Sequence, residues 1–552
     1  MWLSTAHLYD VIYGKGFMSA EDEADFEAMM ALFYQLSCLH EEMHKMDNNR
    51  SVWLCAGGYV SAMFDRNRGM ADSTRERLRD MMPRFLDTIH EDGLHYEIGG
   101  YGPGTVACMQ IFARVIRGAE GIDYFKEKVD GVGFEEFYRA IPYCWVPGET
   151  SLRLYSYRDR ISHWESLGAG YLEYDVPELG WALSRLHERN SVPMFLHWPQ
   201  GFEFYTYKEP VDVHPPARCN NIFKTTGMAF LRGSWENGAT SLHFRYGFQG
   251  SSHGGGLDKL NVEITRGDET LIVDPIVSER SYDKNVVIVD GECQEQCSGK
   301  LLYEHLEDNS AVQCVSAVGG FGEWPNRKFL DDPRAEINYW CPTHDECFPG
   351  KARMRRTVAQ VLNSVYIIRD TLFSLDDAEH DYEWLWHTFN QPQFSGDAQR
   401  KLYHYMPKKR FYSEGLSQQT FEGARYDIAG SSLNCVGGRA NLQIAWSLFG
   451  ADLPRSIGHT QTLSRYDCVS TSETGERFVS QVLNRLHLSA RGKDVAMTTV
   501  FIPTSVEASG DEIRVVSIAD RSLDACEVVL QINGQMQTVS IDEQSGHWEL
   551  KA

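Results

Sequence analysis

The spacing of apolar residues changes once along this chain, and this change constrains the fold more than any other feature. Before about residue 220, apolar residues recur every three or four positions, as they do in amphipathic helices. After that point, short β-branched or alternating runs are separated by Gly, Asp and Asn, as is typical of strands. The sequence therefore predicts an α-helical domain over residues 1–220 and an antiparallel β-sheet domain over residues 221–552.

Specific segments show the helical spacing of apolar residues in the first half and the strand-like spacing in the second. The helical segments are joined by short Gly-rich stretches, which predicts a helical array or toroid rather than a bundle. In the second half, Ile264–Asp274 reads ITRGDETLIVD, and its two alternating runs around an acidic Gly-Asp turn predict a hairpin. The helical segments are 22–46, 73–93, 104–121, 133–145 and 175–190, and the other strand-like runs are 240–248, 285–291, 365–373, 495–503, 513–518 and 525–541.

Charge and composition exclude several classes of partner. The formal net charge of -24 argues against a general nucleic-acid or membrane-surface binder, although a few clustered Arg and Lys residues can still bind an anionic substrate. No run of about twenty apolar residues occurs, and no basic segment followed by an apolar run opens the chain. We therefore expect a cytoplasmic protein, and its 13 scattered cysteines suit free thiols better than a disulfide framework.

Two short patterns resemble metal sites but lack a full ligand set. His40–His44 reads HEEMH, which matches the H-E-x-x-H pattern that places two zinc ligands on one helix face. Asp47 and Arg50 stand where the metzincin pattern continues with Gly and His, and nothing marks Glu76 as a replacement ligand. Cys341–Cys347 reads CPTHDEC, but no second pair lies near it. We interpret the first pattern as histidines on a helix face and the second as a loop with buried thiols.

Three other segments carry a resemblance to a known family. Met46–Trp53 reads MDNNRSVW, Asp92–Gly102 reads DGLHYEIGGYG, and Leu242–Pro275 contains SSHGGGLDKLN followed by a strand, a Gly turn and a strand ending in VDP. Together they resemble the heparinase II/III-like polysaccharide lyases, which are related to oligoalginate lyases, glycosaminoglycan lyases and uronate epimerases. The later runs NVVIVDG and VYIIRDTLF are similar to strands of the same family.

The resemblance implies an α+β multidomain fold. It consists of an N-terminal (α/α) toroid followed by an antiparallel β-sandwich, with the substrate cleft between them. Its order of helices and then sheets agrees with the periodicity. The helical half is short for this family, so the alternatives are an incomplete toroid or missing N-terminal helices.

The resemblance also implies a set of catalytic residues, which suit the elimination of a uronate. Such a lyase removes the C5 proton and expels the C4 oxygen, after neutralising the neighbouring carboxylate. Asn49 and Arg50 would supply the planar and forked donors that stabilise the charge. Tyr101 would act as base and acid, and His253, beside three glycines, would share that work or hold the carboxylate. In the same cleft, the candidates for substrate binding are Asn48, His95, Tyr96, Arg245 and Lys259, with Tyr96 also the rival to Tyr101.

Departures from the family pattern concern the metal. Some members hold a zinc ion with a second histidine after the His253 position, the later aspartate and another histidine. Here Gly254 and Gly255 follow His253, and Lys284 stands where a histidine usually precedes Asn285. Asp274 remains as a candidate ligand, so we expect no required cofactor and regard a structural divalent metal as doubtful.

The expected activity is β-elimination on a uronic-acid-containing glycan of the glycosaminoglycan or alginate type. The partner is then an acidic polysaccharide or oligosaccharide, with neither nucleic acid nor membrane involved, and a homo-oligomer is compatible with this interpretation. A uronate C5-epimerase on the same scaffold and a non-catalytic carbohydrate-binding protein remain as alternatives.

Overall fold

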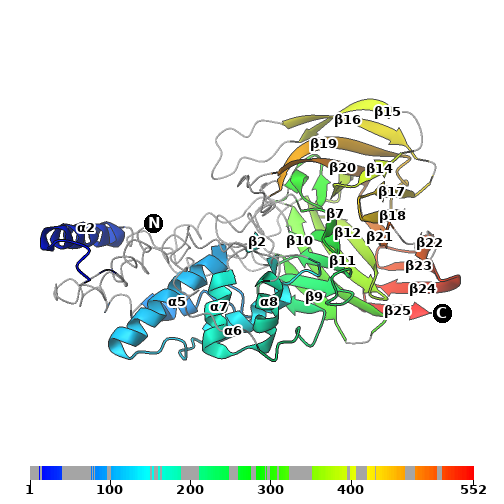
Figure 1. Ribbon diagram of the computed structural model, residues 1–552. Coiled ribbons are helices and arrows are strands. Elements are labelled where there is room, and N and C mark those ends of the chain that lie inside the picture. Colours follow the sequence, from blue (N-terminus) through cyan, green and yellow to red (C-terminus); the bar gives the residue numbers. More distant parts are fainter. Residues whose placement is uncertain are drawn as a thin grey trace.

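A computed structural model gives the fold of this protein, with helices and strands grouped on opposite sides (Figure 1). Within the residues described below, no helix has both the length and the apolar character needed to cross a membrane. The structure describes residues 12, 15–39, 76, 79, 81–95, 101–148, 152–153, 160–161, 164–187, 211–247, 259–274, 281–292, 294, 299–307, 310–321, 351–394, 398–405, 419–428, 430–466, 479–506 and 513–551.

The described α-helices all precede residue 188 and pack around one apolar core. In α5, Val106, Met109, Phe112 and Ile116 follow the helical period and are buried. Pro103 lies in the first turn of this helix, where a missing N–H is tolerated. The described helical elements of this half are α2 (Ala20–Leu39), α5 (Tyr101–Glu120), α6 (Phe134–Ala140), η2 (Ile141–Cys144), α7 (Trp164–Tyr174) and α8 (Pro177–His187). Two short strands, β1 (Leu152–Arg153) and β2 (Arg160–Ile161), lie between η2 and α7, and a further 3-10 helix, η4 (Ser281–Asp283), lies in the second half.

The described part of the second half forms four antiparallel sheets. The predicted hairpin at Ile264–Asp274 is present as β6 and β7, which turn at Gly267 and Asp268. In hydrogen-bonded order, the strands of the five-stranded sheet are β3 (Asn221–Phe223), β4 (Met228–Arg232), β5 (Thr240–Arg245), β6 (Asn261–Arg266) and β7 (Glu269–Ile272), and those of the four-stranded sheet are β22 (Ile513–Asp520), β23 (Ala525–Ile532), β24 (Gln535–Asp542) and β25 (His547–Lys551). The strands of the eight-stranded sheet are β14 (Gln391–Gln393), β17 (Ser432–Val436), β18 (Ala440–Phe449), β21 (Val495–Ser505), β12 (Val365–Ser374), β11 (Ala352–Val361), β10 (Val312–Phe321) and β9 (Lys300–His305). The strands of the six-stranded sheet are β15 (Ala398–Tyr405), β16 (Gln419–Asp427), β19 (Ser456–Tyr466), β20 (Val479–Gly492), β13 (His380–Thr388) and β8 (Val287–Val289).

One apolar core joins three of these sheets. Trp384 and Trp386 of β13, Trp446 of β18, Phe501 of β21 and Phe244 of β5 all belong to it and are at most 1% exposed. The alternation of buried and solvent-facing side chains along each strand places these large rings on the inner faces. The first half of the β region is therefore packed directly against the eight- and six-stranded sheets.

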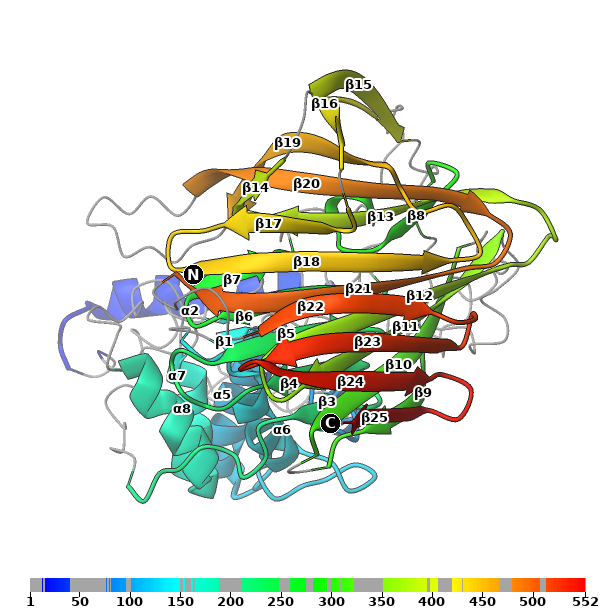
Figure 2. The same cartoon turned by 90° about the vertical axis from the view of Figure 1, so that its right-hand side faces the viewer.

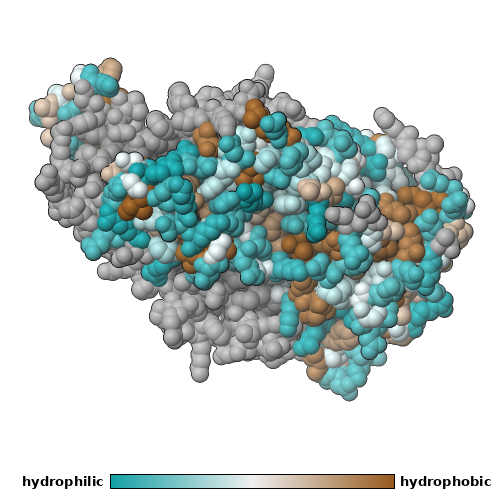
Figure 3. All heavy atoms as spheres, turned by 90° about the horizontal axis from the view of Figure 1, so that it is seen from below, coloured by the Kyte–Doolittle hydropathy of each residue, from teal (hydrophilic) through white to brown (hydrophobic). Residues whose placement is uncertain are grey.

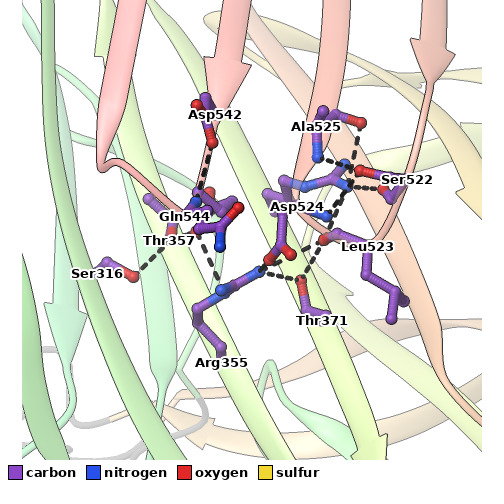
Figure 4. Close-up of polar contacts among 12 residues, drawn as sticks. Ser316, Arg355, Thr357, Thr371, Ser522, Leu523, Asp524, Ala525, Asp542 and Gln544 are labelled. Carbon is purple, nitrogen blue, oxygen red and sulfur yellow. Dashed lines mark hydrogen bonds and ion pairs between the residues drawn. The ribbon is translucent and has the colours of Figure 1, made fainter.

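The four-stranded sheet covers the other face of the eight-stranded sheet (Figure 2). A second apolar core lies between these two sheets. Arginines of β11 and β12 also bind the four-stranded sheet through hydrogen bonds. Arg355 Nη2 donates to Asp524 Oδ1 (2.8 Å) and Thr371 Oγ1 (3.1 Å), as Figure 4 shows. Arg369 Nη2 donates to the carbonyl oxygen of Ser522 (2.7 Å). Charge-assisted bonds of this kind fix the turn between β22 and β23.

Hydrophilic side chains cover most of the described surface in the view of Figure 3, with apolar residues interspersed. Most of the exposed large apolar side chains come from separate elements, for example Leu302 of β9, Leu402 of β15 and Met536 of β24, while Met29 and Leu32 both lie on α2. Singly scattered apolar residues are normal on protein surfaces.

A buried histidine makes the stability of the β region depend on pH. Burial alone would lower the pKa of His380, but hydrogen bonds to Asp290 Oδ2 (2.9 Å) and Asp376 Oδ1 (3.0 Å) outweigh it and raise that pKa above its usual value. A raised histidine pKa stabilises the folded state below the unfolded pKa of about 6.5, and this contribution disappears as pH rises through the folded pKa. We expect the melting temperature of the wild type to exceed that of His380→Gln at about pH 6, and this excess to shrink at about pH 9. A difference that grows with pH would contradict this assignment.

Candidate functional site

A row of polar side chains lies on one face of β5 and β6. Successive side chains of a strand point to opposite faces of the sheet, and here Leu242, Phe244, Val262 and Ile264 fill the apolar core on one side. The alternate residues point to the other side, and each is at most 2% exposed. We call these six residues, Ser241, His243, Arg245, Asn261, Glu263 and Thr265, the β5–β6 polar row.

This row faces the helical part of the molecule. Phe230 of β4 is the cross-strand neighbour of His243, and their ring centroids lie 4.7 Å apart. Phe230 belongs to the apolar cluster that the helices build, together with Phe112 of α5 and Leu179 of α8. The polar row therefore lies on the side of the sheet where the two halves of the chain meet.

The register of β5 and β6 pairs complementary groups across the row. His243 lies opposite Glu263, and Arg245 lies opposite Asn261. Burying charged groups costs several kcal/mol each unless partners compensate, so an ordinary core would not collect them on one sheet face. Within the described residues, the buried Nδ2 of Asn261 has no hydrogen-bond acceptor. The row is thus a concentration of donors and charges beside the junction of the two halves.

The turn that precedes α5 is attached to the end of β5. Asp92 accepts hydrogen bonds from the backbone N–H of Thr226 (2.7 Å) and from its hydroxyl (2.8 Å). The next carbonyl oxygen, that of Gly227, accepts from the backbone N–H groups of Tyr246 (2.8 Å) and Gly247 (2.9 Å). A Cβ on Gly227 would come within 1.9 Å of Gly247, so glycine is required where these two backbones cross.

This attachment brings two distant segments of the sequence together. Tyr101 follows His95 by six positions in the sequence, and His253 follows Gly247 by six. Six positions of chain span at most roughly 20 Å, so Tyr101 lies within that distance of His95. Tyr101 is the first residue of α5.

A hub at Asn285 holds the strands on either side of the polar row. The Asn285 amide nitrogen Nδ2 donates to the carbonyl oxygens of Val262 (2.8 Å) and Val273 (2.7 Å), and its backbone N–H donates to Asn261 Oδ1 (2.9 Å). Its Oδ1 accepts from the backbone N–H of His387 (2.8 Å). Two segments that carry the family resemblance, DKLN and NVVIVDG, thus meet through these bonds and stiffen the region that supports the site.

A buried arginine completes this hub. Arg356 Nη1 donates to the carbonyl oxygens of Leu260 (2.6 Å) and Asn285 (2.5 Å). Its Nε and Nη2 bind the two carboxylate oxygens of Asp370 at 2.6 and 2.7 Å, and both side chains are fully buried. The position of Leu260, and with it Lys259, therefore depends on this ion pair.

Comparison with known proteins was made by sequence and by structure. No model of a protein family matches this sequence, and no curated protein matches it either. The crystal structure of heparinase III superposes with a TM-score of 0.57 over 90% of this chain and 67% of its own, at 12% identity. The chain has the heparinase III fold.

Two further solved structures agree with this finding. A second heparinase III structure gives a TM-score of 0.56 at 14% identity, over 90% of this chain and 66% of its own. The heparan sulfate lyase HepC from Pedobacter heparinus gives 0.53 at 11% identity, over 90% and 66%. The chain thus spans about two thirds of the length of these structures, and the resemblance seen in the sequence is confirmed at the level of the fold.

Only some of the predicted site residues lie in the part of the chain that the structure describes. Arg245 ends β5 and Lys259 precedes β6, so they flank the segment that carries His253. The amide of Gln294 fixes the backbone of Lys259, accepting from its N–H at 2.9 Å and donating to its carbonyl oxygen at 2.8 Å. The predicted residues outside the described part are Asn48, Asn49, Arg50, Tyr96 and His253, as are the patterns at His40–His44 and Cys341–Cys347.

Burial decides what the described candidates can do. Arg245 and Lys259 are each 1% exposed, so they would act on a ligand through their field or by holding the segment between them. Burial, followed by the charge of the nearby His90, lowers the pKa of His95 to about 3, so this imidazole is neutral at pH 7. It can exchange hydrogen bonds but cannot supply positive charge to a carboxylate.

The structure also indicates which tyrosine is unsuitable as a base. Burial, followed by the charges of Asp92 and Glu304, raises the pKa of Tyr246 above its ordinary value. A phenol in this environment holds its proton more strongly, whereas a lyase base has to release it near pH 7. Tyr246 is therefore a structural neighbour of the junction.

Sequence reasoning did not single out His243, Glu263, Arg356 or Asp370. The sequence does hint at Arg356 and Asp370, because charged residues interrupt the otherwise apolar run VYIIRDTLF and the preceding run RMRRTVAQV. A charged residue within a buried strand pattern needs a partner, but only the structure identifies which one.

Proposed function

We propose that this protein is a polysaccharide lyase that cleaves a uronic-acid-containing glycan by β-elimination. The observation that carries the proposal is the junction at Asp92, Thr226 and Gly227, which joins the turn before α5 to the end of β5 beside the β5–β6 polar row. Tyr101 and His253 follow these two joined segments in the sequence. The heparinase III fold supports the proposal, since the superposed structures include a heparan sulfate lyase. The (α/α) toroid and the β-sandwich, with the cleft between them, are part of this proposal.

In the proposed reaction, the C5–H bond of the uronate breaks and its electron pair forms the C4–C5 double bond. Tyr101 takes the proton, the C4–O bond breaks, and the leaving oxygen receives a proton from Tyr101 or His253. Asn49 and Arg50 neutralise the substrate carboxylate and stabilise the enolate-like charge. One group on one side of the ring can serve as both base and acid when the proton and the oxygen leave from the same side.

Substrate binding in this proposal uses positive charge close to the junction. Asn48 and Tyr96 would contact the glycan, and His95 would act as a neutral hydrogen-bonding group. Arg245 and Lys259 would add a positive field in a chain whose net charge is -24, so that an acidic glycan is attracted locally. The names of the superposed structures favour a glycosaminoglycan over alginate as the substrate.

The test is a panel of heparan sulfate, hyaluronan, chondroitin and alginate, with a neutral glucan as the matched control. A lyase produces an unsaturated uronate, so we expect absorbance near 230 nm to grow with at least one acidic glycan and not with the glucan. Proton exchange at C5 without new absorbance would show an epimerase instead. Binding without either change would show a non-catalytic carbohydrate-binding protein.

A further inference from the structure

A buried ion pair lies next to the Asn285 hub. Lys284 Nζ donates to Asp274 Oδ1 at 2.6 Å, and the two side chains are 4% and 2% exposed. Asp274 follows β7 and Lys284 precedes β8, so the pair joins the ends of two strands from different sheets. A charged pair this deeply buried persists because each partner compensates the other.

The backbone around the pair is fixed by the hub. Asn285, the neighbour of Lys284, donates through Nδ2 to the carbonyl oxygen of Val273, the neighbour of Asp274, at 2.7 Å. Arg356 Nη1 holds the carbonyl oxygen of Asn285. Both residues of the pair therefore come from segments that are bonded to each other, and the ammonium is held against the carboxylate.

This arrangement does not fit a divalent metal at Asp274. Zinc binds a carboxylate oxygen at about 2.0–2.2 Å, and Asp274 Oδ1 already accepts a hydrogen bond from the Lys284 ammonium at 2.6 Å. A protonated lysine has no lone pair with which to ligate a metal, and it repels one. Among the residues that the structure describes, no group of three His, Cys, Asp or Glu side chains could hold a metal ion.

We infer that the Lys284 ammonium is a built-in replacement for the divalent cation that some heparinase II/III-like lyases hold at this aspartate. In this protein, the single positive charge of Lys284 neutralises Asp274. In the relatives that hold a metal, the divalent cation would neutralise a larger set of ligands. The histidine replaced by Lys284 and the histidine missing after His253 then have one common explanation, because a lysine cation needs neither of them. The inference concerns folding and holds whichever reaction the protein catalyses.

The first test uses the wild-type protein and needs no variant. We expect metal analysis of the purified protein to find well below one zinc, calcium or other divalent ion per chain. We also expect that neither EDTA nor added ZnCl₂ shifts the melting temperature. About one tightly held metal per chain, removed by EDTA with a fall in melting temperature, would overturn the inference.

The second test measures the pair itself. Lys284→Met removes the ammonium that Asp274 binds, and Asp274→Asn removes the charge of the carboxylate that Lys284 binds. We expect each to lower the melting temperature by at least about 5 °C. The control Lys351→Met removes an exposed lysine that pairs with Asp290 at 3.2 Å, and it should shift the melting temperature by less than about 2 °C.

The double variant separates a coupled pair from two independent effects. Lys284→Met with Asp274→Asn removes both charges, so its loss should be smaller than the sum of the single losses. Additive losses would mean that the two residues act separately, which would also overturn the inference. If a variant does not fold, the metal and chelator measurements on the wild type still decide the question.

Discussion

Replacing Tyr101 with Phe is expected to lower lyase turnover by roughly 10²–10⁴-fold, the range that a general acid–base group contributes. The substitution removes only the hydroxyl that would take the C5 proton, so substrate binding should change far less than turnover. The measurement is the initial rate of absorbance growth near 230 nm on the most reactive glycan, together with KM. The melting temperature of the variant should match that of the wild type.

Two other tyrosines serve as controls for this prediction. Tyr96→Phe tests the rival residue of the same segment and should keep most of the activity. Tyr246→Phe alters a phenol whose pKa is raised by burial, so it should affect stability more than turnover. Loss of activity in Tyr96→Phe with a nearly intact Tyr101→Phe enzyme would transfer the catalytic role to Tyr96.

The periodicity of the sequence predicts the described helices well where the apolar stripe is regular. The expected segments 104–121 and 133–145 correspond to α5 and to α6 with η2. Helix α7 was not expected, because Gly168 and Gly170 weaken a helix interior. Gly170 is nevertheless required, since a Cβ there would come within 2.3 Å of the Tyr138 ring of α6. Close packing between two helices outweighs local propensity, and the sequence alone does not reveal that contact.

The polar strands show a second limit of prediction from sequence. In β20, Arg485 and His487 alternate with apolar residues, a pattern that normally indicates a solvent-facing side. Both are nevertheless at most 1% exposed, because Arg485 Nε donates to His387 Nε2 (2.9 Å) and His487 bonds to Thr460 Oγ1 (2.8 Å). These partners lie on other strands, tens of residues away, so pairing rather than pattern decides their burial.

In the candidate site, too, some features could be predicted from the sequence and others could not. The roles of Tyr101 and His253 are predicted from the short resemblances around them, and they stay predictions. The β5–β6 polar row follows from strand alternation once β5 and β6 are assigned, but which face looks toward the helices does not. The Asn285 hub and its Arg356 partner depend on contacts that no local pattern encodes. The sequence thus suggests candidate reactive side chains, whereas the buried groups that hold the strands together are seen only in the structure.

Replacing Arg356 with Met is expected to destabilise the β region by about 3–5 kcal/mol, the cost of removing one partner of a buried ion pair. Asp370 would remain fully buried without its two charge-assisted bonds, and the carbonyl oxygens of Leu260 and Asn285 would lose their donor. Urea unfolding followed by tryptophan fluorescence measures the effect, because Trp386 packs under the Arg356 guanidinium.

An exposed arginine and a double variant distinguish this cost from a general effect of losing charge. Arg400→Met removes a partner of Glu422 where both side chains are at least 70% exposed, and should cost less than about 1 kcal/mol. Arg356→Met combined with Asp370→Leu removes the unpaired carboxylate and should recover part of the loss. If the double variant is no more stable than Arg356→Met alone, the bonds to Leu260 and Asn285 outweigh the ion pair, and the hub rather than the charge stabilises this region.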